Sequence, residues 1–171
     1  DITIRALEEL ESSDLIFCED TRTTIKLLNH YNIKNKLMSY HEHSDVKTRK
    51  FIIDEIENGK NVSLVSDAGT PLISDPGYKL VKELKKRNLR VTSCPGPSSP
   101  IAAITLSGLP SDKFFFSGFL PVKVKAKKDY LEELKNIKST LIFFESSNRI
   151  IKTLGTILEI FGNRKISICR E

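Results

Sequence analysis

The stretch SDAGTPLISDPGY, residues 66–78, lies between an apolar run (NVSLV, 61–65) and a basic segment with helical periodicity. It concentrates Gly, Pro, Ser and Asp, a composition typical both of tight turns and of loops that hold a small ligand against the backbone. It also carries two acidic residues, Asp67 and Asp75, although the chain of 171 residues has a net charge of +5. The stretch therefore marks a strand-to-helix connection and a local reversal of charge.

Short apolar strands alternate with amphipathic helices on both sides of this loop. Strands are predicted at residues 14–20, 36–40, 61–67, 89–94, 114–120, 140–146 and 165–171. Helices are predicted at residues 2–10, 21–31 with Thr21 as N-cap, 44–60, 77–88, 100–109, 129–138 and 148–162, and a polar basic stretch at 121–128. The alternation indicates an α/β fold of right-handed βαβ units with a mostly parallel sheet in the N-terminal lobe.

The pattern changes between Pro110 and Lys113, which predicts two lobes: an N-terminal α/β domain at 1–112 and a second, mixed α/β domain at 113–171. Hydrophobic residues make up 39% and charged residues 29% of the chain, as in ordinary soluble proteins. No signal peptide pattern or apolar run of about 18 residues predicts a membrane segment. Three widely spaced cysteines favour neither disulfides nor a metal site, so we expect a cytoplasmic protein without a metal.

The loop at 66–78 follows a predicted strand, as do CEDTR (18–22) and CPGPSS (94–99). Ligands of open α/β sheets bind beyond the carboxyl ends of strands, so we expect these three loops to converge if their strands are neighbours. No glycine-rich phosphate motif is present, and Asp67 and Asp75 would repel a phosphate. A neutral or cationic ligand with a ribose, such as S-adenosylmethionine, fits better; the alternative is that the loop contains only tight turns.

Several segments, in their order and spacing, match those of a known family: DITIRALEEL, CEDTR, LLNHYNI, SYHEH, SLVSDAGTPLISDPGYKLV, PGPSSPIAAITLSGLP, FFFSGFLP, TLIFFESSNRI and a terminal CRE. Over essentially the whole chain they resemble the tetrapyrrole methylase superfamily, and within it the bacterial methyltransferases of small-subunit ribosomal RNA. The motif SDAGTPLISDPGY is the most specific of them, since relatives that act on corrinoids or diphthine carry a shorter loop.

The resemblance implies an S-adenosyl-L-methionine-dependent enzyme that methylates the ribose 2′-hydroxyl of a cytidine in the decoding region of 16S rRNA. It implies a homodimer with the cofactor in the cleft between two α/β domains. Carried over residue by residue, it places the cofactor against Asp67, Gly69, Thr70, Pro71, Ile73, Ser98, Ser99, Pro100, Phe144 and Glu145. The family's first strand and its strands beyond Arg170 and Glu171 are not present, so we expect an incomplete cleft in this chain.

Candidates for the base that accepts the hydroxyl proton are His41, Glu42 and His43, which follow a predicted strand; the alternative is a solvated loop. Candidates for RNA contact are Arg22, Lys123, Lys125, Lys127 and Arg149, although a solvated basic surface gives the same pattern. Two other functions stay open. One is methylation of a tetrapyrrole or another small molecule, and the other is RNA binding without catalysis.

Overall fold

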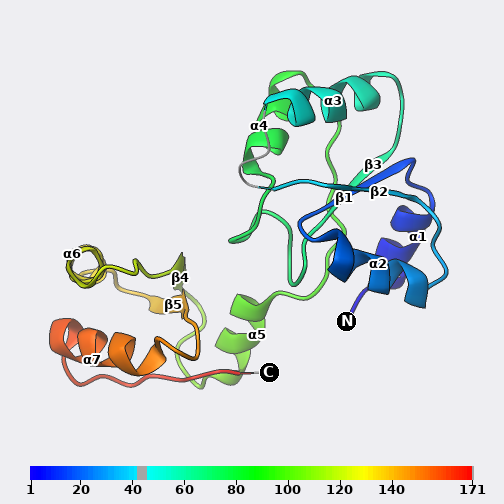
Figure 1. Ribbon diagram of the computed structural model, residues 1–171. Helices are drawn as coiled ribbons and strands as arrows, with labels where there is room; N and C mark the ends of the chain where they lie inside the picture. Colours follow the sequence, from blue (N-terminus) through cyan, green and yellow to red (C-terminus); the bar gives the residue numbers. More distant parts are fainter. Residues whose placement is uncertain (42–45, 171) are drawn as a thin grey trace. The chain divides into compact units, whose positions relative to one another are not determined.

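The computed structural model describes residues 1–41 and 46–170, which form two compact units, Asp1–Ser98 (unit 1) and Ser99–Glu171 (unit 2) (Figure 1). The division falls after Ser98 rather than after Asp112, because helix α5 (Ser99–Leu106) belongs to the second unit. A contact within unit 2 holds this helix, since the Cys169 thiol lies 3.8 Å from the carbonyl oxygen of Ala103.

Unit 1 alternates helices and strands as the sequence predicts. Its elements are α1 (Ile4–Glu11), β1 (Leu15–Cys18), α2 (Thr21–His30), β2 (Lys36–Ser39), α3 (Val46–Glu57), β3 (Val62–Val65) and α4 (Tyr78–Lys86). Among the described residues the strands form one parallel sheet in the order β2-β1-β3, with Phe17 opposite Met38 and Leu64. The parallel sheet and the helical crossovers are therefore confirmed.

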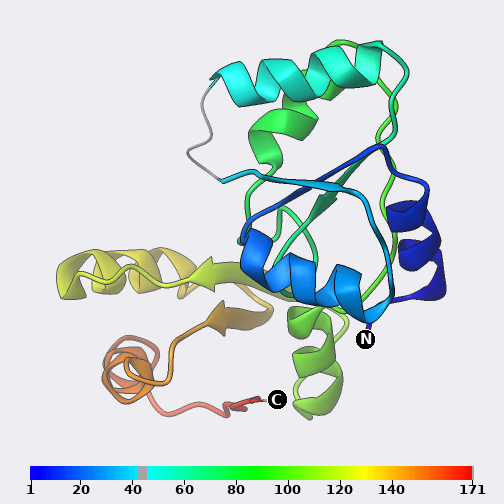
Figure 2. The same ribbon diagram turned by 45° about the vertical axis from the view of Figure 1, so that its right-hand side comes forward.

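The central strand β1 is buried on both faces, as expected for a parallel sheet covered by helices. Leu15 and Phe17 belong to one core cluster, with Ile52 of α3 and Leu80 of α4. Ile16 points to the opposite face, where the cluster includes Leu10 and Leu28. Figure 2 shows the resulting layers, with α3 and α4 on one side of the strands and α1 and α2 on the other.

Two details of unit 1 differ from the sequence prediction. Residues 89–94 form no strand, because a ladder needs a neighbouring edge and no described strand pairs with them. Leu89 and Val91 instead pack directly against the core beside α4. The N-cap of α2 is Asp20 rather than Thr21, since the Asp20 carboxylate accepts the Arg22 amide hydrogen at 2.8 Å.

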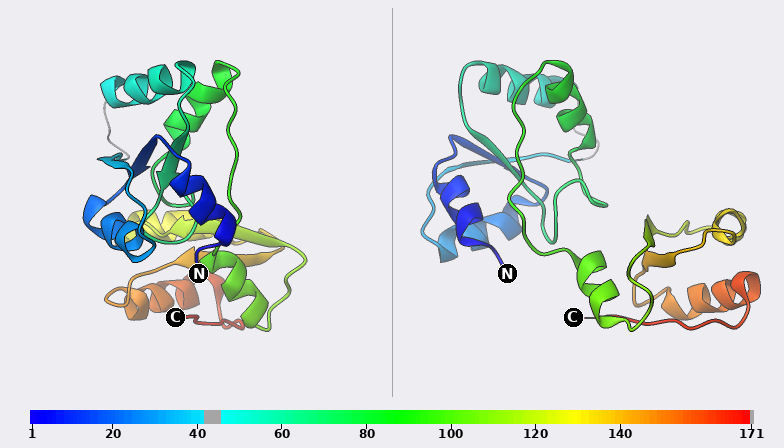
Figure 3. Two further views of the ribbon diagram at one scale, coloured as in Figure 1. Left: turned by 90° about the vertical axis from the view of Figure 1, so that its right-hand side faces the viewer. Right: turned by 180° about the vertical axis from the view of Figure 1, so that it is seen from behind.

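Unit 2 contains α5, β4 (Phe114–Phe119), α6 (Val124–Leu134), β5 (Thr140–Phe144) and α7 (Ile150–Phe161) (Figure 3). Strands β4 and β5 pair in parallel, with an irregularity between Phe116 and Phe119. The predicted basic stretch at 121–128 is wrong in part, because α6 already begins at Val124. The predicted strand at 165–171 is also wrong over 165–170, which pairs with no described strand. No helix in either described range is both long and apolar enough to cross a membrane.

Candidate functional site

The three loops expected to converge in unit 1 are joined by hydrogen bonds. The Asp20 amide, in the loop after β1, donates to the Asp67 carboxylate at 3.2 Å. The Thr70 hydroxyl, in the loop after β3, donates to the carbonyl oxygen of Pro97 at 3.1 Å. Since β1 and β3 are parallel neighbours, their carboxyl ends meet at one edge of the sheet. The predicted convergence is therefore confirmed, although residues 89–94 contribute no strand to it.

The backbone of the loop at 66–78 takes an unusual course. Leu72 and Ser74 adopt positive φ of 73° and 63°, which side chains rarely accept. Gly77 has φ of 134°, and a Cβ atom there would lie 2.7 Å from Leu72 Cδ1 and 2.9 Å from Leu64 Cδ2. Only glycine fits that position, so Gly77 fixes where the loop ends and α4 begins. Backbone strain of this kind clusters at ligand sites.

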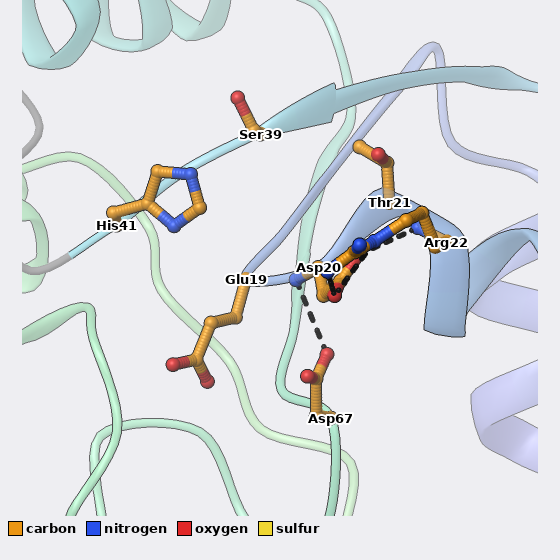
Figure 4. Close-up of a pocket in the computed structure, with 7 residues that line it drawn as sticks. All are labelled: Glu19, Asp20, Thr21, Arg22, Ser39, His41 and Asp67. Carbon is orange, nitrogen blue, oxygen red and sulfur yellow. Dashed lines mark hydrogen bonds and ion pairs between the residues drawn. The ribbon is translucent and has the colours of Figure 1, made fainter.

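A pocket of about 510 Å³ opens at the carboxyl ends of the strands of unit 1 (Figure 4). Its walls come from the loop after β1, the end of β2 and the loop after β3. Thr21 and Arg22 lie on one side and His41 on the other. The lining residues are Glu19, Asp20, Thr21, Arg22, Ser39, His41 and Asp67. A crevice at this edge is where open α/β sheets bind ligands.

The pKa values of the acidic groups around the pocket are shifted in different directions. Burial raises the pKa of Glu19, and the negative charges of Asp75 and Asp67 raise it further. Burial likewise raises the pKa of Asp75, a hydrogen bond from Ser66 opposes the rise, and Asp67 adds to it. In contrast, the hydrogen bond from the Arg22 guanidinium lowers the pKa of Asp20 to about 2. Glu19, Asp67 and Asp75 (the acidic cluster) therefore concentrate negative charge beside the pocket, which His41 opposes in part by lowering the pKa of Glu19.

This chemistry suits a particular kind of ligand. A phosphate would meet like charges from the acidic cluster, which disfavours it. Carboxylates accept hydrogen bonds from sugar hydroxyls and stabilise a positive charge. In the described ranges no three His, Cys, Asp or Glu side chains are grouped so that they would hold a metal ion. A hydroxyl-bearing, cationic small molecule is the ligand that the acidic cluster fits best.

The predicted cofactor residues are divided between the two units. Gly69, Thr70, Pro71 and Ile73 lie in the loop at 66–78, and Ser98 follows the Pro97 carbonyl that Thr70 binds. Ser99, Pro100, Phe144 and Glu145 lie in unit 2. Of the predicted set, Asp67 lines the pocket of unit 1 directly. Of the base candidates, His41 lines it too, whereas Glu42 and His43 lie outside the described residues.

Glu145 is the centre of a buried network in unit 2. Its carboxylate accepts hydrogen bonds from the Thr153 hydroxyl at 2.6 Å and from the Ser146 amide at 2.9 Å, and it pairs with Arg149 at 3.0 Å. Burial opposes the charged form of Glu145, but the hydrogen bonds from Thr153 and Ser146 and the charges of Arg149 and Lys127 outweigh it and lower the pKa. The carboxylate is thus largely occupied by partners within the unit.

Lys127 belongs to this network, which corrects its predicted role. Its ammonium donates to the Thr153 hydroxyl at 2.6 Å and lies 4.0 Å from the Glu145 carboxylate, with the side chain only 7% exposed. The basic run was expected to be solvated, but as part of α6 it turns one lysine toward α7. A buried, paired ammonium is not available to an RNA phosphate, so the prediction for Lys127 as an RNA contact is wrong.

The other predicted RNA contacts differ in how exposed their charged groups are and in whether those groups are already paired. Lys123 and Lys125 are exposed on unit 2. Arg149 is partly buried and also donates to the carbonyl oxygen of Leu120 at 2.8 Å. Arg22 is 88% exposed, but its guanidinium pairs with Asp20 at 2.6 Å. The two lysines thus keep their charges most accessible, and RNA contact by Arg22 and Arg149 stays a prediction.

Sequence reasoning did not name Glu19 or Ser39 as site residues, and it used Asp75 only to choose between kinds of ligand. Glu19 and Ser39 stand at the carboxyl ends of β1 and β2, beside the predicted convergence point. The available signal was therefore position at a strand end, the same signal that pointed to Asp67 and His41. Asp75 lies far along its loop, and only the folded loop brings its charge near Glu19.

The family model for Tetrapyrrole (Corrin/Porphyrin) Methylases matches residues 1–171. This chain belongs to the tetrapyrrole methylase family. A crystal structure of the methyltransferase CobJ has the same fold, with a TM-score of 0.62 at 14% identity, covering 92% of this chain and 70% of that one. The two-lobed α/β fold expected from the sequence is therefore confirmed at the level of the family.

Curated members of this family are much more similar in sequence. A Rickettsia prowazekii protein named ribosomal RNA small subunit methyltransferase I is 56% identical over 171 residues, covering all of this chain and 61% of that protein. A Mesorhizobium japonicum protein of the same name is 51% identical over 172 residues, covering all of this chain and 58% of that protein. This tetrapyrrole methylase chain thus spans about three fifths of the length of these relatives.

Proposed function

We propose that the protein containing this chain transfers a methyl group from S-adenosylmethionine to the 2′-hydroxyl of a cytidine in small-subunit 16S rRNA. The observation that carries the proposal is the 56% identity, across the whole chain, to a relative named as a ribosomal RNA small subunit methyltransferase. Such a substrate implies action in the cytoplasm, and the resemblance of the sequence to its family further supports a homodimer.

The residues around the pocket of unit 1 support the cofactor. When bound, S-adenosylmethionine supplies a methyl group on a cationic sulfur, together with ribose hydroxyls. Glu19, Asp67 and Asp75 match both features, because carboxylates accept from hydroxyls and stabilise positive charge. The loop at Gly69, Thr70, Pro71 and Ile73 adjoins Asp67 and forms the proposed cofactor wall. Ser98, Ser99, Pro100 and Phe144 complete the proposed set.

The remaining chemistry is positioning and proton removal. Holding the ribose hydroxyl in line with the methyl group supplies much of the rate. The oxygen must also lose its proton as it forms the new bond, and a base adds about 10²–10⁴-fold. Among the described candidates we propose His41, which lines the pocket opposite Arg22. Glu42 and His43 are the alternatives for this role.

The test is methyl transfer by the full-length protein from labelled S-adenosylmethionine to small ribosomal subunits that lack the modification. Digestion of the rRNA to nucleosides should give labelled 2′-O-methylcytidine as the product. The family's name makes a tetrapyrrole the second candidate substrate, so a tetrapyrrole is offered in parallel. Transfer to the tetrapyrrole alone would overturn the rRNA proposal, and absence of any transfer would favour a non-catalytic RNA-binding protein.

A further inference from the structure

Helix α4 carries an uninterrupted basic face. At about 100° per residue, Tyr78, Lys79, Lys82, Lys85 and Lys86 occupy an arc of about 120°, and all are exposed. Leu80 and Leu84 on the other side are buried in the core of unit 1. No acidic residue falls within the arc. We call these five residues the α4 stripe; it extends about 12 Å along the helix axis.

Two of the acidic groups near the α4 stripe are already paired with other cations. Glu83, at its margin, pairs with Arg49 of α3 at 3.2 Å. Glu57 of α3 pairs with Arg87 at 2.9 Å. Lys82, Lys85 and Lys86 take part in no ion pair with any described residue. The positive charges of Lys82, Lys85 and Lys86 therefore face solvent on the exposed side of α4, which Figure 1 labels.

Helix stabilisation explains only part of this arrangement. Cations near a helix C-terminus are favourable, which accounts for Lys85 and Lys86 in the last turn. Lys79 stands in the first turn, where the macrodipole opposes a positive charge, and Lys82 lies in the middle. Tyr78 is also 61% exposed, and the Lys82 ammonium lies 5.7 Å from the centre of its ring. Intrinsic helix stability does not select an exposed aromatic residue at the head of a row of lysines.

We propose that the α4 stripe is a docking surface for RNA, with the lysines contacting the phosphate backbone and Tyr78 stacking on an unpaired base. Lysine rows and exposed aromatic rings are the two elements that single-stranded RNA recognition combines. The proposal rests on the function proposed above, in which RNA is the substrate. It also agrees with the chain path, because Tyr78 follows Gly77 directly and so adjoins the proposed cofactor loop.

The experiment compares variants of the full-length protein in binding to an rRNA fragment and in methylation of small subunits. The stripe variant combines three substitutions, Lys82→Gln, Lys85→Gln and Lys86→Gln. It removes three positive charges and keeps residues that form helices well. We expect RNA affinity to fall at least about tenfold, and the slope of log affinity against log salt to fall by about three. The KM for subunits rises while kcat and cofactor affinity are unchanged. Tyr78→Ala weakens RNA binding, and Tyr78→Phe retains it.

The matched control removes three exposed lysines elsewhere on unit 1, by combining Lys26→Gln, Lys34→Gln and Lys36→Gln. The triple Lys→Arg variant of Lys82, Lys85 and Lys86 should restore binding. Equal losses in the stripe variant and the control, or an unchanged salt slope, would overturn the proposal. So would a loss seen with assembled subunits but not with the rRNA fragment, which would indicate an acidic protein partner. Stripe-dependent RNA binding without methyl transfer supports the docking surface and contradicts only the proposed function.

Discussion

Glu19 and Glu145 occupy equivalent places in two parallel sheets, since each directly follows the last residue of a strand. Their surroundings are opposite. Glu19 borders an open pocket with Asp67 and Asp75 nearby, and its pKa is raised by burial and by those charges. Glu145 is enclosed by Thr153, Arg149 and Lys127; burial opposes its charge, but these partners lower its pKa.

The difference separates a carboxylate that is available to a ligand from one that stabilises its own domain. Both residues attract attention as acidic groups at strand ends, where ligands of α/β proteins bind. In unit 1 the neighbouring acidic charges raise the pKa of Glu19, so a cationic or hydroxyl-bearing ligand gains by binding there. In unit 2 the charge is balanced internally. If Glu145 contributes to cofactor binding, we expect it to do so by holding the β5–α7 connection in its conformation.

The largest expected effect is on the buried network of unit 2. Glu145→Gln leaves the Lys127 ammonium buried without a compensating charge, so we expect the free energy of unfolding to fall by about 3 kcal/mol. Urea denaturation of the full-length protein measures the change. Glu159→Gln is the control, because it breaks a solvent-exposed pair with Lys128 and should change stability by less than about 1 kcal/mol. Equal effects of the two variants would contradict the contrast between Glu19 and Glu145.

A substitution in the loop of unit 1 should change binding rather than stability. Thr70→Arg places a large side chain against the proposed cofactor wall, and we expect affinity for S-adenosylmethionine to fall about tenfold to hundredfold. Isothermal titration calorimetry on the full-length protein measures it. Thr70→Ser keeps the hydroxyl that donates to Pro97 and should bind nearly as wild type. Wild-type affinity in Thr70→Arg would show that the cofactor lies elsewhere.

The stability contributions of Glu145 and Glu19 should change with pH in opposite directions. A lowered pKa in the folded protein means that Glu145 stabilises it above the unfolded pKa of about 4.3, and that this contribution is lost as the pH falls through the folded value. The difference between wild type and Glu145→Gln should therefore be largest near neutral pH and shrink in acid. A difference that is constant with pH would mean that the Glu145 charge is not the source of the stabilisation.

The smallest expected effect is on stability at Glu19, where the substitution should stabilise the protein instead of destabilising it. Because the folded-state pKa of Glu19 is raised, its protonated form is favoured, and stability is lost as the pH rises through that value. Glu19→Gln should therefore stabilise the ligand-free protein at pH 7 by less than about 1 kcal/mol, and the gain should vanish in acid. Thermal unfolding at several pH values measures it. Destabilisation by Glu19→Gln at pH 7 would show that the acidic cluster is compensated after all.

Local patterns in the sequence sufficed for most elements of unit 1 and for the place of the site. The run LIFC reads as a buried strand, and the Gly-, Pro- and Asp-rich stretches mark the ends of strands. Parallel neighbours bring such ends together, so the contact of the loop after β1 with the loop after β3 followed once β1 and β3 proved to be neighbours. The strand predicted at 89–94 failed because strand formation depends on a partner, which a segment's own residues do not specify.

The remaining differences concern the direction of side chains. The basic run at 121–128 contains four lysines with similar local sequence, yet the start of α6 turns Lys127 into a buried contact with Thr153. Composition does not reveal which lysine faces inward. The opposite case is α4, which the sequence analysis described only as a basic segment with helical periodicity. The spacing of three and four residues between its lysines, read on a helix, was the signal for a single exposed face.

The most direct measurement is the modification state of small-subunit rRNA in cells that lack the gene, read by nucleoside mass spectrometry of the decoding region. The account predicts that one 2′-O-methylcytidine disappears, returns with the wild-type gene, and does not return with Thr70→Arg. A 2′-O-methyl mark that persists after deletion would contradict the account.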